Sequence, residues 1–155
     1  MKAVLQRVIN AEVRVDGKVI GSCNKGYLIL FCAVQNDTIE DIDILAKKVA
    51  NLRVFEDEEG KMNKSILDVD GEVLCISQFT LAADTKKGNR PSFIKAMNPA
   101  DASDYYDDFC RKLTSLGVRR VEKGKFGADM QVSLINDGPV TIILDTDIWN
   151  KNHGN

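Results

Sequence analysis

Histidine is almost absent from this chain, and its scarcity limits the chemistry that the chain can perform. The only one among 155 residues is His153, in the polar segment 150–155. Terminal segments of this kind are usually frayed, so we predict a tail at 150–155 behind one domain at 1–149. A Ser-His-Asp triad, a Cys-His pair or a histidine-rich metal site is therefore not expected. If the chain is an enzyme, it works without histidine, and we expect no metal and no cofactor.

Paired cysteines and long apolar runs are missing as well. No Cys-x-x-Cys pair occurs among the four cysteines, which are Cys23, Cys32, Cys75 and Cys110. Three of the four lie in or beside apolar runs. Reduced, mostly buried thiols in a cytosolic protein are the expected state. No apolar run reaches the roughly 18 residues that a membrane span needs. The opening MKAVLQRVINAEVRV has no apolar core segment or cleavage site of a signal peptide. We therefore expect a cytoplasmic protein with no membrane partner.

A strong excess of charge of one sign is also lacking. The formal net charge is -2, with 44% hydrophobic and 28% charged residues, which is ordinary for a globular protein. This charge balance argues against a generally basic surface that coats nucleic acid. A local basic patch is not, and a patch is all that binding a short RNA end requires.

Hydrophobic periodicity divides the chain into strands and two helices. Alternation around Asp16-Gly17 predicts a hairpin over 13–20, and the unbroken apolar run 26–34 predicts a strand buried on both faces. Helical spacing appears at 39–52, and again from Asn98-Pro99 to 116, where Gly117 follows. Further strands are predicted at 54–55, 72–81, 118–121, 130–136 and 140–144. The sum is a single α/β domain with a mixed, largely antiparallel sheet of about seven strands and two main helices.

The junction between the last two predicted strands is unusual. Asp137-Gly138 alone would predict a tight hairpin turn. Pro139 conflicts with that interpretation because it has no N–H for a ladder and restricts the residue before it. We therefore predict a bend here, at which the hairpin presents a rigid Gly138-Pro139 corner.

Two stretches carry polar groups that chemistry or binding can use. Ser77-Gln78-Phe79-Thr80-Leu81 ends a buried strand, where active sites are common, although a strand that merely surfaces fits equally well. A serine or threonine nucleophile needs a base, for which only a lysine or a carboxylate is at hand. The loop 85–91 holds Lys86, Lys87 and Arg90, which suit an RNA phosphate backbone or simply a solvated surface.

Together these stretches resemble the D-aminoacyl-tRNA deacylases, and the resemblance covers the whole chain. It includes MKAVLQRV with a Val-x-Val-x-Gly hairpin, Ser-Gln-Phe-Thr-Leu at 77–81 and Lys-Gly-Asn-Arg-Pro-Ser-Phe at 87–93. It continues with Phe-Gly-Ala-Asp-Met at 126–130 and Asn-Asp-Gly-Pro-Val-Thr at 136–141. The two signature motifs, 77–81 and 136–141, stand nearly 60 residues apart, and together they are specific.

The resemblance implies a cytoplasmic homodimer that acts on aminoacyl-tRNA. Members of the family remove D-amino acids from tRNA, and also glycine from tRNA for alanine, at sites on the subunit interface. By resemblance, the catalytic stretch is Ser77, Gln78, Phe79 and Thr80. Gly138 and Pro139, joined by a cis bond, would enter the site from the partner, and Arg7 would brace them. The resemblance further places Leu81, Met130, Asn136 and Thr141 at or around the pocket.

Elementary chemistry agrees with these implied roles. A glycine carbonyl beside the substrate's α-carbon would block one direction for a side chain, so L-residues would be rejected while glycine would pass. Hydrolysis assisted by the tRNA 2′-hydroxyl, with backbone N–H donors around Gln78, Phe79 and Thr80, needs no histidine. Thr80 as a covalent nucleophile is the competing mechanism. A non-catalytic RNA-binding module and a structural dimerisation domain are the competing functions.

Overall fold

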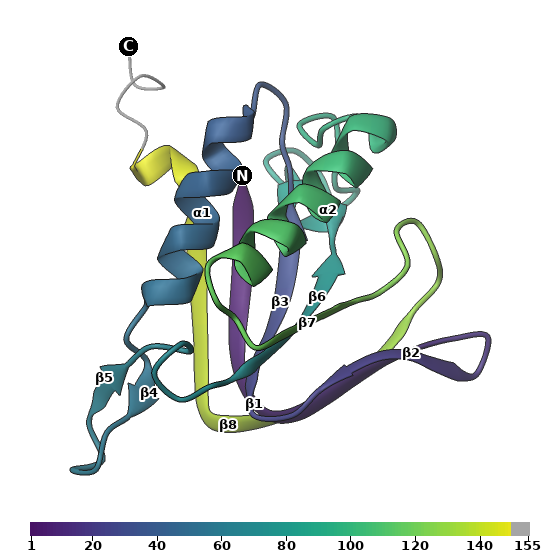
Figure 1. Cartoon of the computed structure of the whole chain (residues 1–155). Helices are drawn as coiled ribbons and strands as arrows, with labels where there is room; N and C mark the ends of the chain where they lie inside the picture. Colours follow the sequence, from purple (N-terminus) through teal and green to yellow (C-terminus); the bar gives the residue numbers. More distant parts are fainter. Residues whose placement is uncertain (150–155) are drawn as a thin grey trace.

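Two helices cover one face of a six-stranded sheet, and a separate two-stranded hairpin lies beside it (Figure 1). This computed structural model describes residues 1–149, so His153 and the predicted tail lie outside the described residues. The helices are α1 (Ile39–Asn51) and α2 (Pro99–Ser115), with short 3-10 helices η1 (Phe79–Ala82) and η2 (Thr146–Ile148). The strands are β1 (Lys2–Val15), β2 (Lys18–Cys23), β3 (Gly26–Cys32), β4 (Phe55–Glu56), β5 (Met62–Lys64), β6 (Glu72–Ser77), β7 (Arg120–Lys123) and β8 (Gln131–Asp145).

The sheet is mixed, as predicted. Its order is β2-β1-β3-β6-β7, and β8 pairs with β1. Strand β1 is antiparallel to β2, β3 and β8, whereas β3, β6 and β7 run parallel to one another. The predicted class of α/β domain with two main helices is therefore confirmed. Periodicity did not reveal β5, and of β1 it predicted only the end, from Val13.

Local sequence signals place several boundaries correctly. Asp16 and Gly17, with φ of 51° and 78°, form the predicted turn between β1 and β2. Helix α1 begins where the Asp41 carboxylate accepts the Thr38 N–H at 2.9 Å. Helix α2 begins at Pro99, after Asn98 has accepted the Asp101 N–H on its side chain at 3.1 Å.

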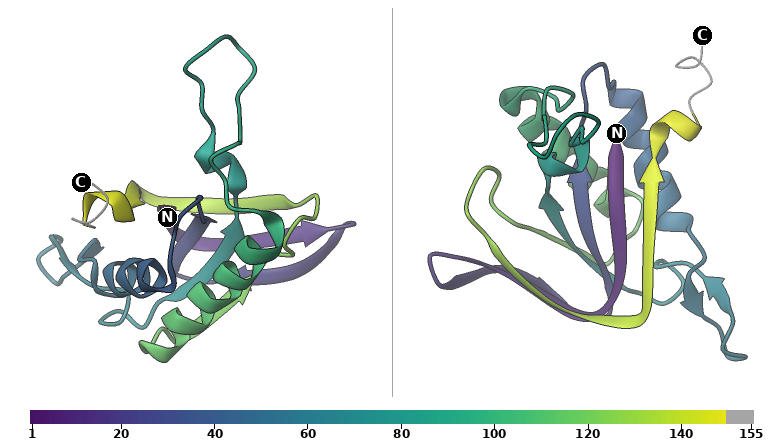
Figure 2. Two further views of the ribbon diagram at one scale, coloured as in Figure 1. Left: turned by 90° about the horizontal axis from the view of Figure 1, so that it is seen from above. Right: turned by 180° about the vertical axis from the view of Figure 1, so that it is seen from behind.

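The main core fills the space between the helices and the sheet. Phe31 of β3 stacks on Phe109 of α2 with ring centroids 4.7 Å apart, and both side chains are buried. A second apolar cluster lies on the opposite face, where no helix covers the sheet (Figure 2, right). It is enclosed because β1, β2 and β8 bend over that face and bring Val8 and Val13 onto Leu74 and Ile76.

The expected burial of the cysteines is confirmed: all four are buried, and none forms a disulfide among the described residues. Within residues 1–149, no helix is long and apolar enough to cross a membrane. The expectation of two strands joined by a hairpin at 130–144 is wrong. The chain forms one strand, β8, that follows β1 along its whole length and carries a bulge at Gly138-Pro139.

Candidate active site

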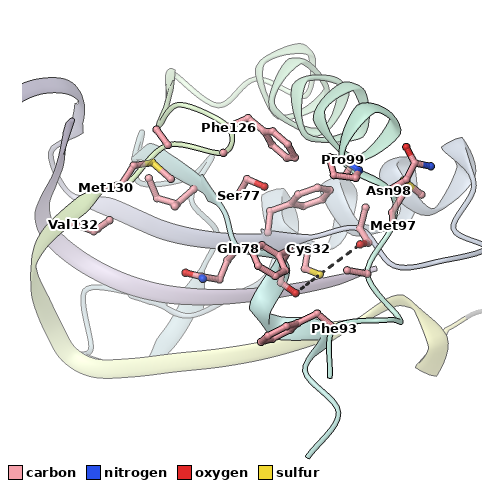
Figure 3. Close-up of a pocket in the computed structure, with 18 residues that line it drawn as sticks. Cys32, Ser77, Gln78, Phe93, Met97, Asn98, Pro99, Phe126, Met130 and Val132 are labelled. Carbon is pink, nitrogen blue, oxygen red and sulfur yellow. Dashed lines mark hydrogen bonds between the residues drawn. The ribbon is translucent and has the colours of Figure 1, made fainter. Parts of the chain in front are cut away.

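A pocket of about 590 Å³ opens where the parallel strands β3 and β6 end (Figure 3). Crevices at the carboxyl ends of parallel strands are common ligand sites, because diverging loops leave space there. Its walls come from β3, β6, the segment before α2, the start of α2 and the loop before β8. Among the lining residues are Cys32, Ser77, Gln78, Phe79, Phe93, Met97, Asn98, Phe126 and Met130.

The predicted catalytic stretch changes direction at this pocket, where a strand gives way to a 3-10 helix. Strand β6 ends at Ser77, and Phe79–Ala82 forms η1, so the expected strand over 72–81 is too long. The Gln78 N–H donates to the Phe31 carbonyl at 2.7 Å, which extends the β3–β6 pairing by one residue. That N–H is therefore occupied. Among the described residues, the N–H groups of Phe79 and Thr80 have no hydrogen-bond acceptor, and they remain as donors for a ligand.

Thr80 lies on the exposed side of η1. Its Oγ1 accepts the Gln78 side-chain amide N–H at 2.6 Å. A carboxamide cannot remove a proton from a hydroxyl, so this contact orients Thr80 without activating it as a nucleophile. Phe79 lines the main pocket, so the peptide group that it shares with Thr80 borders the pocket, whereas the rest of Thr80 and Leu81 does not line it. Leu81 borders a smaller hollow beside Lys2 and Lys95.

Two further groups shape the pocket. The Cys32 thiol lines it, and burial raises the pKa of this thiol to about 11, so it stays neutral. On the other side, the Tyr106 hydroxyl donates to the Cys75 carbonyl and accepts the Gly124 N–H at 3.2 Å. Because Gly124 opens the loop that carries Phe126, this buried tyrosine fixes that wall against β6.

The Gly138-Pro139 corner lies on a bulge of β8. Asn136 pairs with Val8 and Thr141 with Gln6, so the four residues 137–140 stand opposite Arg7 alone. The peptide bond between Gly138 and Pro139 is cis, and both residues are exposed. The strand leaves the sheet here and returns to it without reversing.

Arg7 holds this bulge in place. Its side chain is 5% exposed; Nε donates to the Asp137 carbonyl at 2.9 Å and Nη1 to the Val54 carbonyl at 2.6 Å. A Cβ on Gly138, whose φ is +131°, would lie 2.9 Å from Nη2 of this fixed guanidinium. Only glycine fits this position without a shift of the arginine.

The corner and the pocket of one chain are far apart. Arg7 pairs with Tyr27, four residues before Phe31, and Phe31 pairs with Ser77. At about 3.3 Å per residue and 4.8 Å per strand, Gly138 and Ser77 are on the order of 20 Å apart. Asn136 and Thr141, which flank the bulge, are exposed beside it. One chain thus brings Ser77, Gln78, Phe79 and Met130 to the pocket, and Arg7, Asn136 and Thr141 to the corner.

The basic residues form a third location. Lys86, Lys87 and Arg90 are exposed on a loop that projects from the body (Figure 2, left). The loop is closed at its base by backbone hydrogen bonds of 2.7 and 2.9 Å between Asp84 and Ser92. Phe93 follows directly, and its ring meets the exposed Phe79 ring edge-on, with centroids 5.1 Å apart. The loop is therefore anchored beside the pocket mouth.

Sequence reasoning missed several pocket residues. Cys32 reads as the end of an apolar run, and Met97 and Asn98 as the approach to a helix. Phe93 and Phe126 lie inside the sequence motifs at 87–93 and 126–130, in which neither aromatic residue indicates a pocket by itself. No group of three or more His, Cys, Asp or Glu side chains in residues 1–149 is placed to hold a metal ion.

Comparison with known proteins identifies the family. The sequence model of the family described as D-Tyr-tRNA(Tyr) deacylase matches residues 4–145. A D-aminoacyl-tRNA deacylase of Clostridium novyi (strain NT) is 55% identical over 146 residues, which cover 94% of this chain and 97% of that protein.

Two solved structures share the fold. A c-Myc DNA unwinding element binding protein is 44% identical, with a TM-score of 0.89 over 94% of this chain and 98% of that one. A probable eukaryotic D-amino acid tRNA deacylase has a TM-score of 0.78 over 92% and 97%; at 17% identity it supports the fold alone. The chain therefore belongs to the D-Tyr-tRNA(Tyr) deacylase family, hydrolases that act on the ester bond of aminoacyl-tRNA.

Proposed function

We propose that this deacylase hydrolyses the ester bond of D-aminoacyl-tRNA in the cytoplasm, at active sites that are completed by two identical subunits. The observation that carries the proposal is the place of Gly138 and Pro139. They are exposed on a bulge fixed by the buried Arg7, yet they lie out of reach of the pocket at Ser77 in their own chain. This rigid, exposed corner can complete an active site only if it enters the pocket of a second copy of the chain.

The surface around β8 supports a homodimer. In the described part of the chain, β8 pairs only with β1, so its outer edge is open over 15 residues. Ile9, Ile135 and Ile143 are 53%, 53% and 76% exposed on or beside this edge. Covering such side chains with a second copy removes apolar surface from water and brings two corners toward two pockets.

The corner would act as a stereochemical filter. With no Cβ on Gly138, the backbone there can approach the α-carbon of a bound aminoacyl group more closely than any other residue allows. Backbone on one side of that carbon leaves room for a hydrogen but not for a side chain. L-residues are then rejected by exclusion, and D-residues point their side chains the other way.

A filter that works by excluding side chains cannot exclude glycine. Glycine carries no side chain on either side, so a site that excludes L-residues still admits it. We therefore infer that glycine mischarged on tRNA for alanine is a second substrate. Comparing hydrolysis of glycyl-, D-tyrosyl- and L-tyrosyl-tRNA tests this inference, which fails if glycine resembles the L-substrate.

The chemistry would rely on position and hydrogen bonding. The oxygen of a water molecule bonds to the ester carbonyl carbon, the bond to the tRNA 3′-oxygen breaks, and a proton passes to that oxygen. The neighbouring 2′-hydroxyl can orient the water and relay the proton. The N–H groups of Phe79 and Thr80, which lack acceptors among the described residues, supply donors for the developing oxyanion.

The Thr80 side chain would position substrate in this mechanism. Its hydroxyl faces the Gln78 amide, and no base lies within hydrogen-bond reach among the described residues. Thr80→Ala should then retain activity near the wild-type value, whereas a covalent mechanism loses it. A substrate with a 2′-deoxy terminal ribose gives the converse test, since it should be hydrolysed slowly by the wild type.

The projecting loop is the proposed tRNA contact. Three cations, Lys86, Lys87 and Arg90, stand on a loop that is anchored beside the pocket by Phe93. A phosphate backbone that leads to a terminal ester in the pocket would pass near this loop.

A matched pair of substrates tests the proposed function. Purified protein should release the amino acid from D-tyrosyl-tRNA and leave L-tyrosyl-tRNA intact under the same conditions. Equal binding of charged and uncharged tRNA without any release would instead support a non-catalytic RNA-binding module. Equal release from both enantiomers would refute the stereochemical filter.

A further inference from the structure

The Cys32 thiol lies within reach of two carbonyl groups beside the pocket. Its Sγ lies 3.6 Å from the Phe79 carbonyl oxygen and 3.5 Å from the Ala33 carbonyl oxygen. Figure 3 labels Cys32 among the residues that line the pocket and marks the hydrogen bonds of its sulfur with dashed lines. The Ala33 carbonyl also accepts the Met97 N–H at 3.1 Å, which holds the segment before α2. The single S–H can donate to only one of these oxygens at a time, and donation to the Phe79 carbonyl connects the end of β3 to η1.

The Phe79 carbonyl belongs to the peptide group that also contains the Thr80 N–H. In a planar trans peptide the C=O and N–H bonds point in opposite directions. When the oxygen is held toward the buried Cys32, the N–H of the same peptide is directed away from it. The orientation of this oxyanion donor therefore depends on what holds the Phe79 carbonyl, which belongs to the first residue of η1 and contacts the Cys32 sulfur.

We propose that Cys32 is a positioning residue for deacylation: its S–H holds the Phe79 carbonyl and thereby aims the Thr80 N–H at the substrate. The inference rests on the proposed function only for the identity of the substrate. The orientation of the Phe79–Thr80 peptide group follows from the contacts of the Cys32 sulfur.

The environment of Cys32 suits a donor. Its side chain is 2% exposed, and burial raises its pKa to about 11, so the proton stays on sulfur at neutral pH. A thiolate could only repel the two carbonyl oxygens. The chain also holds a matched control in Cys23, which is 3% exposed and lies 3.8 Å from the Tyr27 carbonyl, among residues of the second cluster.

Three variants separate positioning from packing. Cys32→Ala removes the donor and the sulfur, Cys32→Ser restores a donor, and Cys23→Ala removes an equally buried sulfur elsewhere. A weak S–H hydrogen bond predicts a fall in kcat of about two- to fivefold for Cys32→Ala, with KM nearly unchanged. Cys32→Ser should recover kcat, and Cys23→Ala should keep it while lowering the Tm.

Nuclear magnetic resonance of ¹⁵N-labelled protein gives a second measurement that needs no substrate. The Thr80 amide resonance should shift and broaden in Cys32→Ala, return toward its wild-type position in Cys32→Ser, and stay unchanged in Cys23→Ala. Inactivity of the wild type on D-tyrosyl-tRNA would refute the proposed function while this spectrum still tests the peptide's orientation.

Two results would overturn the inference. The first is a Cys32→Ala variant with wild-type kcat and an unmoved Thr80 resonance, which would leave the thiol a packing role only. The second is a Cys32→Ser variant as impaired as Cys32→Ala, because a restored donor would then have no effect.

Discussion

Replacing Gly138 with alanine is a sharp perturbation of the corner. The new Cβ would lie 2.9 Å from Nη2 of Arg7, 3.0 Å from Cγ2 of Val140 and 3.1 Å from the Val140 nitrogen. The arginine cannot swing aside freely, because its Nε and Nη1 are bound to the carbonyls of Asp137 and Val54. The bulge itself must therefore move.

The backbone adds a second cost at this position. The φ of Gly138 is +131°, a region that side chains strongly disfavour, and strain of this kind is worth about 1–3 kcal/mol. If the displacement is felt fully at the transition state, kcat/KM for a D-substrate falls about 5- to 150-fold. The ratio of D- to L-hydrolysis should shrink at the same time, because the filter is displaced.

Gly60→Ala is the matched control. Gly60 has a φ of +76°, but nothing lies within 4 Å of a Cβ placed there, and the residue is exposed on the turn between β4 and β5. It should lose a little stability and no activity. Time courses on D- and L-tyrosyl-tRNA, with urea unfolding of both variants, make the comparison. A dimeric Gly138→Ala protein with wild-type rates and an unchanged D-to-L ratio would refute the assigned role.

Three further predictions follow from other parts of the molecule. Arg7→Lys should lower the free energy of unfolding in urea by about 1–3 kcal/mol and lower the deacylation rate, because one ammonium group cannot bind the carbonyls of both Asp137 and Val54. The control Arg14→Lys, at an exposed position, should change neither quantity. Equal effects of the two variants would contradict the role of Arg7 in holding the bulge. Replacing Lys86, Lys87 and Arg90 together with alanine should raise KM and reduce the slope of log KM against log salt by about 2, if each contacts one phosphate of a single strand. Lys61→Ala, remote on an exposed turn, is its control, and an unchanged salt slope would place the RNA elsewhere. Burial raises the pKa of both Cys23 and Cys32 from 9.0 to about 11 in the folded chain. Between these two pH values the unfolded chain loses the thiol protons that the folded chain keeps, so the free energy of unfolding should fall as pH rises. The contribution of the two thiols is therefore complete below pH 9.0 and declines toward about pH 11. Urea unfolding across this range should show a smaller decline in Cys23→Ala, and an identical decline would contradict the assignment.

Most of the fold follows from local signals in the sequence. The Asp16-Gly17 turn, the unbroken apolar run that becomes β3 and the Asn98-Pro99 start of α2 each have a mechanism that acts within a few residues. The predicted mixed sheet with two helices is correct for this reason. Strand β5 escaped notice because Met62–Lys64 is short, and two of its three residues are exposed.

The errors have non-local causes. A Gly-Pro pair after Asp137 signals a break, but whether the chain reverses or bulges depends on Arg7, 130 positions away in sequence, which donates to the Asp137 carbonyl. The strand predicted to reach Leu81 ends at Ser77, and an apolar Phe79 hid the change to η1. Periodicity reports which residues are buried and not where the chain turns.

The candidate site was predictable only in part. The motif at 77–81 located one wall of the pocket, the Gly138-Pro139 pair stood out in the sequence itself, and the family resemblance supplied Met130 and Arg7. Cys32 became visible only because β3 pairs in parallel with β6, which brings the ends of two remote strands together. Strand pairing between remote segments is part of the tertiary structure, and no local sequence pattern around Cys32 predicts it.

Mixing two inactive variants tests the shared active site most directly. Gly138→Trp spoils the corner, and Ala128→Trp fills the pocket that Ala128 lines. A heterodimer of the two contains one site with an intact pocket from one subunit and an intact corner from the other. We predict that deacylation of D-tyrosyl-tRNA, absent from each variant alone, returns when the subunits are unfolded together and refolded as a mixture. Two folded variants that form mixed dimers without recovering activity would contradict a site built from two chains.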